Sequence, residues 1–221
     1  MANLVMLSDL SKSNNALINR IKELIGNKPF KLAYIPSQTD KERKYFETGM
    51  DFFSTVGVED FLYFDIDQEF DVSTVVPLTT CDGIYLSGGN TFYFLKKLKE
   101  RKLDFLLKAL AEKGKLMIGV SAGAILMSKS IKIAEFIDEN EIQLKEFDSL
   151  NLVDLEFMPH WESQKTKLQE LLDYSLNQEG SIFTCNDGSG IVIAGSRVDY
   201  FGEIYEIRKG EITARIGKTK V

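Results

Sequence analysis

The first half of the chain alternates short apolar runs with longer segments whose apolar side chains recur at helical spacing. The short runs predict strands, and the amphipathic segments between them predict helices. The predicted strands cover residues 3–7, 31–35, 61–64, 83–86 and 116–120, and the predicted helices cover residues 14–25, 40–56, 91–98 and 103–113. Strands joined by helices of this length pair in parallel, with helices on both faces of the sheet. We therefore predict an α/β fold whose active site lies beyond the carboxyl ends of the strands.

The pattern changes in the last third of the chain. Residues 152–157 predict a strand, and residues 162–176 predict a helix. Short β-type runs separated by glycines then follow at residues 182–184, 190–194, 198–200, 203–207 and 212–216. This spacing is typical of antiparallel hairpins. Because no linker, repeat or low-complexity tract interrupts the 221 residues, we expect one domain over 1–221.

Composition and charge exclude several classes of protein. Apolar residues make up 44% of the chain and charged residues 27%, as in ordinary globular proteins. The net charge of −6 argues against a nucleic-acid partner. No apolar run is long enough to span a membrane, and the first ten residues lack the pattern of a signal peptide, so we expect a cytoplasmic protein with no membrane partner. Cys81 and Cys185 are too few for a disulfide framework and are expected to be reduced thiols. The sequence leaves open whether the chain forms a homo-oligomer.

One motif follows the strand predicted at residues 116–120. Gly119-Val-Ser-Ala-Gly123 fits the G-x-S-x-G nucleophile elbow, in which a serine sits on a tight turn from strand to helix. Glycines flank the serine because side chains at those positions would clash with neighbouring chain. A run of small residues compatible with a helix comes next, which is the context that the motif requires. We interpret Ser121 as a nucleophile, and a structural turn serine is the alternative.

A serine hydroxyl needs a base to become a good nucleophile, and imidazole is the usual base near neutral pH. His160 is the only histidine of the chain. It follows the strand predicted at residues 152–157, so we expect it at the same edge of the sheet as Ser121. A histidine packed against Trp161 is the alternative. A single histidine also excludes zinc sites built on two or three histidines, and we expect no metal.

An imidazole base needs a carboxylate that fixes its tautomer. Asp187 follows the run at residues 182–184 and is the candidate for this role. Asp-Gly is also an ordinary hairpin signal, so a turn is the alternative interpretation. An acidic run at residues 135–141 competes for the same role. Such a run is otherwise a solvated face or a site for a substrate amine.

Backbone N–H groups must converge on the substrate carbonyl oxygen to stabilise the oxyanion. Ala122, directly after the serine, is the usual source of one such group in this motif. The loop Gly88-Gly89-Asn90 is the expected source of the second donor, because paired glycines let the backbone approach a substrate closely. We also expect Gly88 and Asn90 to bind substrate, although Asn90 or Thr91 could instead cap the following helix.

Five segments of the chain, taken in order, match motifs of one known family. They are residues 84–92, 119–124, 158–160, 186–188 and 202–211. In this order they resemble peptidase family S51, the group of aspartyl dipeptidase (dipeptidase E) and cyanophycinase. The resemblance implies a flavodoxin-like fold related to class I glutamine amidotransferase domains, a serine peptidase mechanism and no cofactor. Position by position, it implies that Ser121 is the nucleophile, His160 the base and Gly89 an oxyanion donor.

The chain departs from the family pattern at three places. Ser87 stands where the family often has a third glycine, and Asp187 stands where the dipeptidases commonly have glutamate. Residues 134–140 replace the Asn-Asp-Met-Pro segment of the dipeptidases, which leaves a preference for N-terminal aspartate open. We therefore predict a serine peptidase that hydrolyses short peptides through a Ser-His-Asp triad. An esterase or amidase acting on small non-peptide substrates, or a catalytically silent binding protein on the same scaffold, is the alternative.

Overall fold

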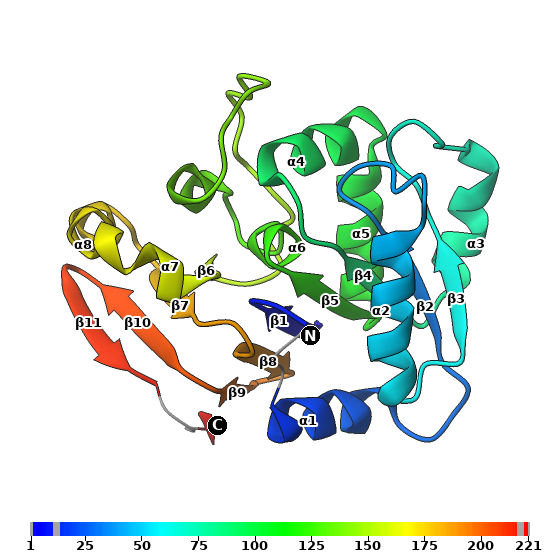
Figure 1. Cartoon of the computed structure of the whole chain (residues 1–221), viewed down its shortest axis with the longest axis horizontal. Helices are drawn as coiled ribbons and strands as arrows, with labels where there is room; N and C mark the ends of the chain where they lie inside the picture. Colours follow the sequence, from blue (N-terminus) through cyan, green and yellow to red (C-terminus); the bar gives the residue numbers. More distant parts are fainter. Residues whose placement is uncertain (1, 11–13, 216–218, 221) are drawn as a thin grey trace.

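The larger of two β-sheets forms the centre of the molecule (Figure 1). The computed structural model describes residues 2–10, 14–215 and 219–220. Within them, the strands of this sheet are β1 (Asn3–Leu7), β2 (Lys31–Ile35), β3 (Asp60–Tyr63), β4 (Gly83–Leu86), β5 (Leu116–Val120), β8 (Gly190–Ala194), β9 (Arg197–Phe201) and β12 (Thr219–Lys220). Their order is β12-β9-β8-β1-β5-β4-β2-β3, and β1 to β5 run in parallel. The predicted α/β fold with a mostly parallel sheet is confirmed.

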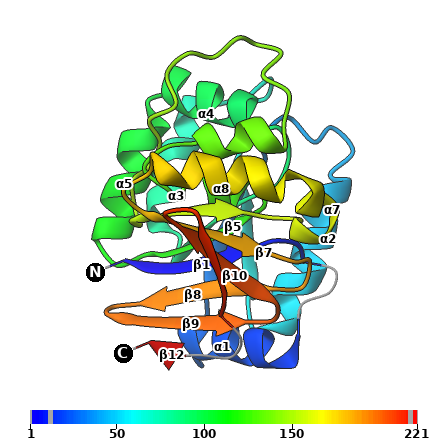
Figure 2. The ribbon, with the colours of Figure 1, turned by 90° about the vertical axis from the view of Figure 1, so that its left-hand side faces the viewer.

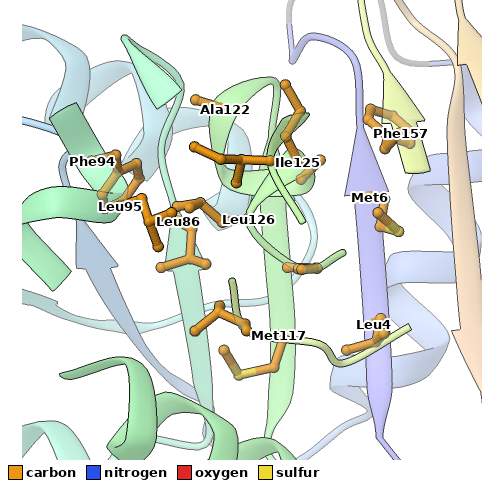
Figure 3. Close-up of a cluster of buried hydrophobic side chains, with 14 of the residues drawn as sticks. Leu4, Met6, Leu86, Phe94, Leu95, Met117, Ala122, Ile125, Leu126 and Phe157 are labelled. Atoms are coloured by element: carbon orange, nitrogen blue, oxygen red, sulfur yellow. The ribbon is translucent and has the colours of Figure 1, made fainter. Parts of the chain in front are cut away.

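Helices cover both faces of this sheet because its strands are apolar on both sides. In β1, Val5 packs in one cluster with residues of α1 (Asn15–Ile25) and α2 (Lys44–Thr55). Its neighbour Met6 points the opposite way, as alternate residues of a strand do. Met6 belongs to a second cluster that includes residues of α3 (Val75–Thr80), α4 (Thr91–Glu100), α5 (Leu103–Glu112) and α6 (Ala122–Ile125). Figure 3 shows part of this second cluster around Leu126 and Met117.

A smaller sheet lies beside the first one and carries the last part of the chain (Figure 2). Its strands are β6 (Leu155–Met158), β7 (Ser181–Cys185), β10 (Ile204–Arg208) and β11 (Glu211–Ala214), in the order β11-β10-β7-β6. Between β6 and β7 the chain forms α7 (Trp161–Gln164) and α8 (Leu168–Leu176). Phe157 of β6 and Phe183 of β7 join the cluster that contains Met6. The two sheets therefore share one hydrophobic core.

Several elements differ from the sequence-based expectation. The helix expected at residues 40–56 begins only at Lys44. The Asp40 carboxylate accepts hydrogen bonds from the Tyr45 and Phe46 N–H groups of the first helical turn, so Asp40 itself lies before the helix. The helix expected at residues 162–176 is divided into α7 and α8 by a 3₁₀ turn at Lys165–Lys167. A 3₁₀ turn at Val72–Thr74 and the helix α3 after it were not expected at all.

The predicted C-terminal hairpins form, but they belong to two different sheets. β8 and β9 pair as an antiparallel hairpin in the large sheet, and β10 and β11 do so in the small sheet. The run expected at residues 182–184 is β7, which pairs in parallel with β6 and antiparallel with β10. Of the run expected at residues 212–216, residue 216 lies outside the described residues.

Candidate active site

Three adjacent strands of the large sheet end at the same edge, and the loops after them carry candidate residues. Ser8 follows β1, Gly88 and Gly89 follow β4, and Ser121 follows β5. The Ser121 N–H donates a 2.9 Å hydrogen bond to the carbonyl of Leu7, which keeps the ends of β5 and β1 together. A site at this edge agrees with the rule that open parallel sheets bind ligands beyond their carboxyl ends.

The backbone of Ser121 is strained in the way that a nucleophile elbow requires. Its φ of 50° and ψ of −111° lie in a region that residues with a Cβ rarely adopt. A Cβ added to Gly119 would lie 2.4 Å from the Gly123 carbonyl oxygen, and one added to Gly123 would lie 2.1 Å from the Leu86 carbonyl oxygen. Both glycines are therefore needed for the strand to turn this sharply into α6.

The small sheet brings the other two candidate residues to the same place. β6 and β7 run in parallel, with Met158 opposite Thr184, so the loops after them begin side by side. His160 lies in the first loop, and its positive φ of 55° turns the chain before α7. Asp187 lies in the second loop, which then leads directly into β8 beside β1.

Ser121, His160 and Asp187 form a continuous chain of short contacts. The Ser121 Oγ lies 3.0 Å from His160 Nε2, and His160 Nδ1 lies 2.7 Å from Asp187 Oδ1. A carboxylate beside Nδ1 favours the tautomer with its proton on that atom, which leaves Nε2 free to accept the serine proton. Partial burial acts to raise the pKa of the Asp187 carboxyl, but hydrogen bonds from His160 and Ser8 outweigh it, so this pKa lies below its usual value. The carboxyl therefore stays ionised beside the imidazole at neutral pH.

Two further side chains hold this arrangement, and the sequence analysis missed both. Ser8 is fully buried, and its hydroxyl donates to Asp187 Oδ1 at 3.0 Å while it accepts the His160 N–H at 2.8 Å. Both oxygens of the Glu162 carboxylate lie 3.0 Å from the Asp187 backbone nitrogen and accept its N–H. The signals that could have found them are positional, since Ser8 follows directly after a buried strand and Glu162 lies two residues after His160.

The two expected oxyanion donors are the N–H groups of Ala122 and Gly89. Neither donates a hydrogen bond within the described residues, so both are available to a substrate oxygen. A Cβ added to Gly88 would lie 3.7 Å from Ser121 Cβ, so the glycine loop lies against the serine. A Cβ added to Gly89 would lie 2.0 Å from Ser37 Oγ, so only glycine fits there.

Asn90 has a different position from the one expected for a substrate-binding residue. Its side-chain oxygen accepts the Tyr93 N–H and caps α4, and its amide donates to the Glu139 carbonyl. Asp138, from the acidic run that competed with Asp187, accepts hydrogen bonds from the backbone and the hydroxyl of Thr91. These contacts anchor the start of α4, and the His160 ring contacts Asp187 rather than this run.

A cavity of about 990 Å³ opens beside the candidate site. Ser121, His160, Gly88 and Gly89 line it, together with the loop between β2 and α2. Asn90 and Ala122 are not among the residues that line it. In the part of the chain that the structure describes, no group of three or more His, Cys, Asp or Glu side chains is arranged to hold a metal ion, and no helix combines the length and apolar character needed to cross a membrane.

Comparison with protein families assigns the chain. The model of peptidase family S51 matches residues 4–201. The chain belongs to peptidase family S51. Membership in S51 confirms the prediction of a serine hydrolase of the peptidase class, and it confirms the resemblance drawn from the motifs.

Individual S51 relatives support the same assignment. An uncharacterized peptidase of Listeria monocytogenes serovar 1/2a, Lmo0363, is 29% identical over 180 residues, which cover 76% of this chain and 83% of the relative. Peptidase E of Escherichia coli O1:K1 / APEC is 32% identical over 111 residues, which cover 46% of this chain and 48% of that enzyme. This second match spans about half of each chain.

Solved structures of similar proteins have the same fold as this S51 member. The crystal structure of a provisionally named peptidase E protein from Listeria monocytogenes EGD-e superposes with a TM-score of 0.75 at 27% identity, covering 90% of this chain and 98% of that one. A peptidase from an acI-B1 Actinobacterium also gives a TM-score of 0.75, covering 100% of this chain and 96% of that one, at 16% identity. At that identity, the second comparison bears on the fold alone.

Proposed function

We propose that this S51 peptidase hydrolyses short peptides with Ser121 as nucleophile, His160 as general base and acid, and Asp187 as the residue that orients the imidazole. The observation that carries the proposal is the unbroken series of contacts from Ser121 Oγ through the His160 ring to Asp187 Oδ1. The strained backbone of Ser121 supports it independently, because strain of this kind is typical of reactive serines on elbows.

The proposed reaction has two halves that share one proton carrier. His160 Nε2 takes the proton from Ser121 Oγ as this oxygen forms a bond to the scissile carbonyl carbon. The tetrahedral intermediate then collapses, the C–N bond breaks, and His160 gives its proton to the leaving amine. A water molecule repeats the sequence on the acyl-enzyme, with His160 first accepting and then returning a proton to Ser121, and releases the carboxylic acid. Asp187 stays ionised throughout and stabilises the imidazolium.

The backbone supplies the oxyanion donors in this proposal. The N–H groups of Ala122 and Gly89 would stabilise the negative charge on the carbonyl oxygen, and each donor of this kind is worth a factor of roughly 10²–10³ in kcat. Gly88 would contact the substrate beside them. Asn90 is not part of the proposed substrate surface, because its amide is engaged at the start of α4.

A short peptide is the substrate that the site supports best. A cavity of about 990 Å³ beside Ser121 is of the size that holds a compact ligand, rather than an extended groove for a protein chain. We place this reaction in the cytoplasm, and two buried free thiols, Cys81 and Cys185, support that proposal because thiols persist in reducing compartments.

A labelling experiment tests the catalytic assignment. A fluorophosphonate probe should label the native protein and fail to label Ser121→Ala or protein unfolded in urea, since only an activated serine reacts readily. Hydrolysis of a dipeptide mixture should stop in Ser121→Ala and His160→Ala. Labelling without hydrolysis of any peptide, but with turnover of simple esters, would favour the esterase alternative. Absence of both labelling and turnover would leave a silent binding protein and contradict the proposal.

A further inference from the structure

The residues that line the cavity beside Ser121 indicate which substrate side chain it accepts. This inference rests on the proposed function. Four of the cavity's apolar or aromatic lining residues, Tyr34, Pro36, Tyr85 and Val120, are buried. Tyr34 and Tyr85 lie with their ring centroids 5.0 Å apart, and each is only 3% exposed. Phe52 and Tyr45 of α2 add two further rings to the wall. Four tyrosine or phenylalanine side chains therefore line the cavity.

The hydroxyls of the two buried tyrosines, Tyr34 and Tyr85, carry no charge at neutral pH. Burial raises the pKa of both the Tyr34 and the Tyr85 hydroxyl above its usual value. Both phenols therefore stay protonated over the whole physiological range. An apolar or aromatic group that enters the cavity displaces water from these rings without leaving a charge unpaired.

A carboxylate has no buried cationic partner among the described residues that line the cavity. The lysines there, Lys41 and Lys44, are exposed and lie beside the acidic Asp40 and Glu42 in sequence. Arg43 lies between them in sequence but does not line the cavity, because its guanidinium lies over the Tyr63 ring and pairs with Glu69. Moving an aspartate side chain from water onto these aromatic rings would cost free energy that no buried cation offsets among the described lining residues.

We propose that this cavity binds a large apolar or aromatic side chain of the peptide residue next to the scissile carbonyl, and that it disfavours aspartate. The cavity is continuous with Ser121, His160 and the Gly88-Gly89 loop, so a side chain adjacent to the attacked carbonyl reaches it directly. The selectivity follows from burial of apolar surface on the rings.

The first test compares dipeptides that differ only in the first residue, with phenylalanine, leucine, alanine or aspartate before the same second residue. We expect kcat/KM for the phenylalanine and leucine substrates to exceed that for alanine by about 10- to 100-fold, because that is the range set by burying an additional large apolar group. The aspartate substrate should be the poorest of the four. A preference for aspartate, or equal values for all four, would overturn the inference.

The second test blocks the cavity from a surface position. Thr48 is exposed on α2 and lines the cavity, whereas Thr55 is exposed on the same face two turns further along and does not line it. Thr48→Trp should lower the phenylalanine-to-alanine ratio of kcat/KM by about tenfold or more, since a ring at this position occupies the space needed by the larger substrate. Thr55→Trp is the matched control and should leave the ratio unchanged. An unchanged ratio in Thr48→Trp would show that the side chain binds elsewhere.

Fluorophosphonate labelling of Ser121 in each variant separates this inference from the proposed function. Labelled, active enzyme with the wrong side-chain preference contradicts only the cavity assignment. Loss of labelling and of all peptide hydrolysis in the unmodified protein contradicts the proposed function, and the cavity assignment with it.

Discussion

Replacement of Ser8 by alanine tests whether the buried hydroxyl behind the candidate triad positions it. The change removes the donor to Asp187 Oδ1, at 3.0 Å, and the acceptor of the His160 N–H, at 2.8 Å, without adding any atom. A hydrogen bond to an ionised acceptor contributes about 1.5–3 kcal/mol and a neutral one about 0.5–1.5 kcal/mol. The hydrogen bond from Ser8 to Asp187 matters most in the transition state, because Asp187 then faces a fully formed imidazolium. Its loss there should lower kcat by about 10- to 100-fold, since about 1.4 kcal/mol is a factor of ten. KM should change by less than about threefold, because the lost bonds act on the triad rather than on the substrate.

The assay combines steady-state kinetics on the best dipeptide with acid unfolding followed by circular dichroism. Since the Ser8 hydroxyl helps to keep the pKa of Asp187 low, its removal should raise that pKa and move the midpoint of acid unfolding to higher pH. Ser189→Ala is the matched control. Ser189 is also a buried serine, and its hydroxyl accepts only the Glu203 N–H among the described residues. A kcat in Ser8→Ala equal to that of the control would refute the positioning role.

Four other outcomes follow from the contacts. Asp187→Asn should lower kcat by about 10³- to 10⁴-fold with little change in KM, because an amide favours the wrong imidazole tautomer. Steady-state kinetics on the purified enzyme measure this. Gly123→Ala should cost at least about 3 kcal/mol in urea unfolding, as its Cβ would lie 2.1 Å from the Leu86 carbonyl oxygen, while Gly180→Ala, with no atom nearer than 3.8 Å, should not. Asp138→Ala should lower stability by about 1–3 kcal/mol through loss of its two bonds to Thr91, whereas Glu141→Ala, at an exposed position, should leave the urea midpoint in place. The pKa of Asp187 is lower in the folded protein than in the unfolded chain. Its contribution to stability should therefore be fully present above the unfolded pKa of about 3.9 and be lost as the pH falls through the folded pKa. An acid titration in which Asp187→Asn behaves like the native protein would contradict this.

The parallel half of the fold could be predicted because its strands are apolar on both faces. All five residues of β5 are buried, and such an unbroken run between helical segments has few other interpretations. α3 escaped prediction because a six-residue helix that includes Pro77 has too few turns to show a period. The start of α2 was misplaced since Asp40 caps the helix from four residues before its first residue, beyond the usual capping position.

The candidate site could be predicted as a set of residues, but not as a set of contacts. The G-x-S-x-G motif identifies Ser121 by local sterics, and a single histidine leaves one choice of base. Ser8 has no motif, because its contacts exist only once β1 lies between β5 and β8. Likewise, short β-type runs separated by glycines predict strands at β7 and β8 without telling which sheet each one joins, since such runs are the same in both sheets.

The division of the site between two sheets has a consequence for synthesis of the protein. Ser121 leaves the ribosome 39 residues ahead of His160, which in turn precedes Asp187 by 27. Under the proposed mechanism, Ser121 has no base until His160 has been synthesised. His160 in turn lacks the carboxylate that orients its ring until Asp187 has followed. A growing chain, or one truncated before β7 and β8 have docked, is therefore inert toward its neighbours in the crowded exit region, and hydrolytic competence arrives only with the completed fold.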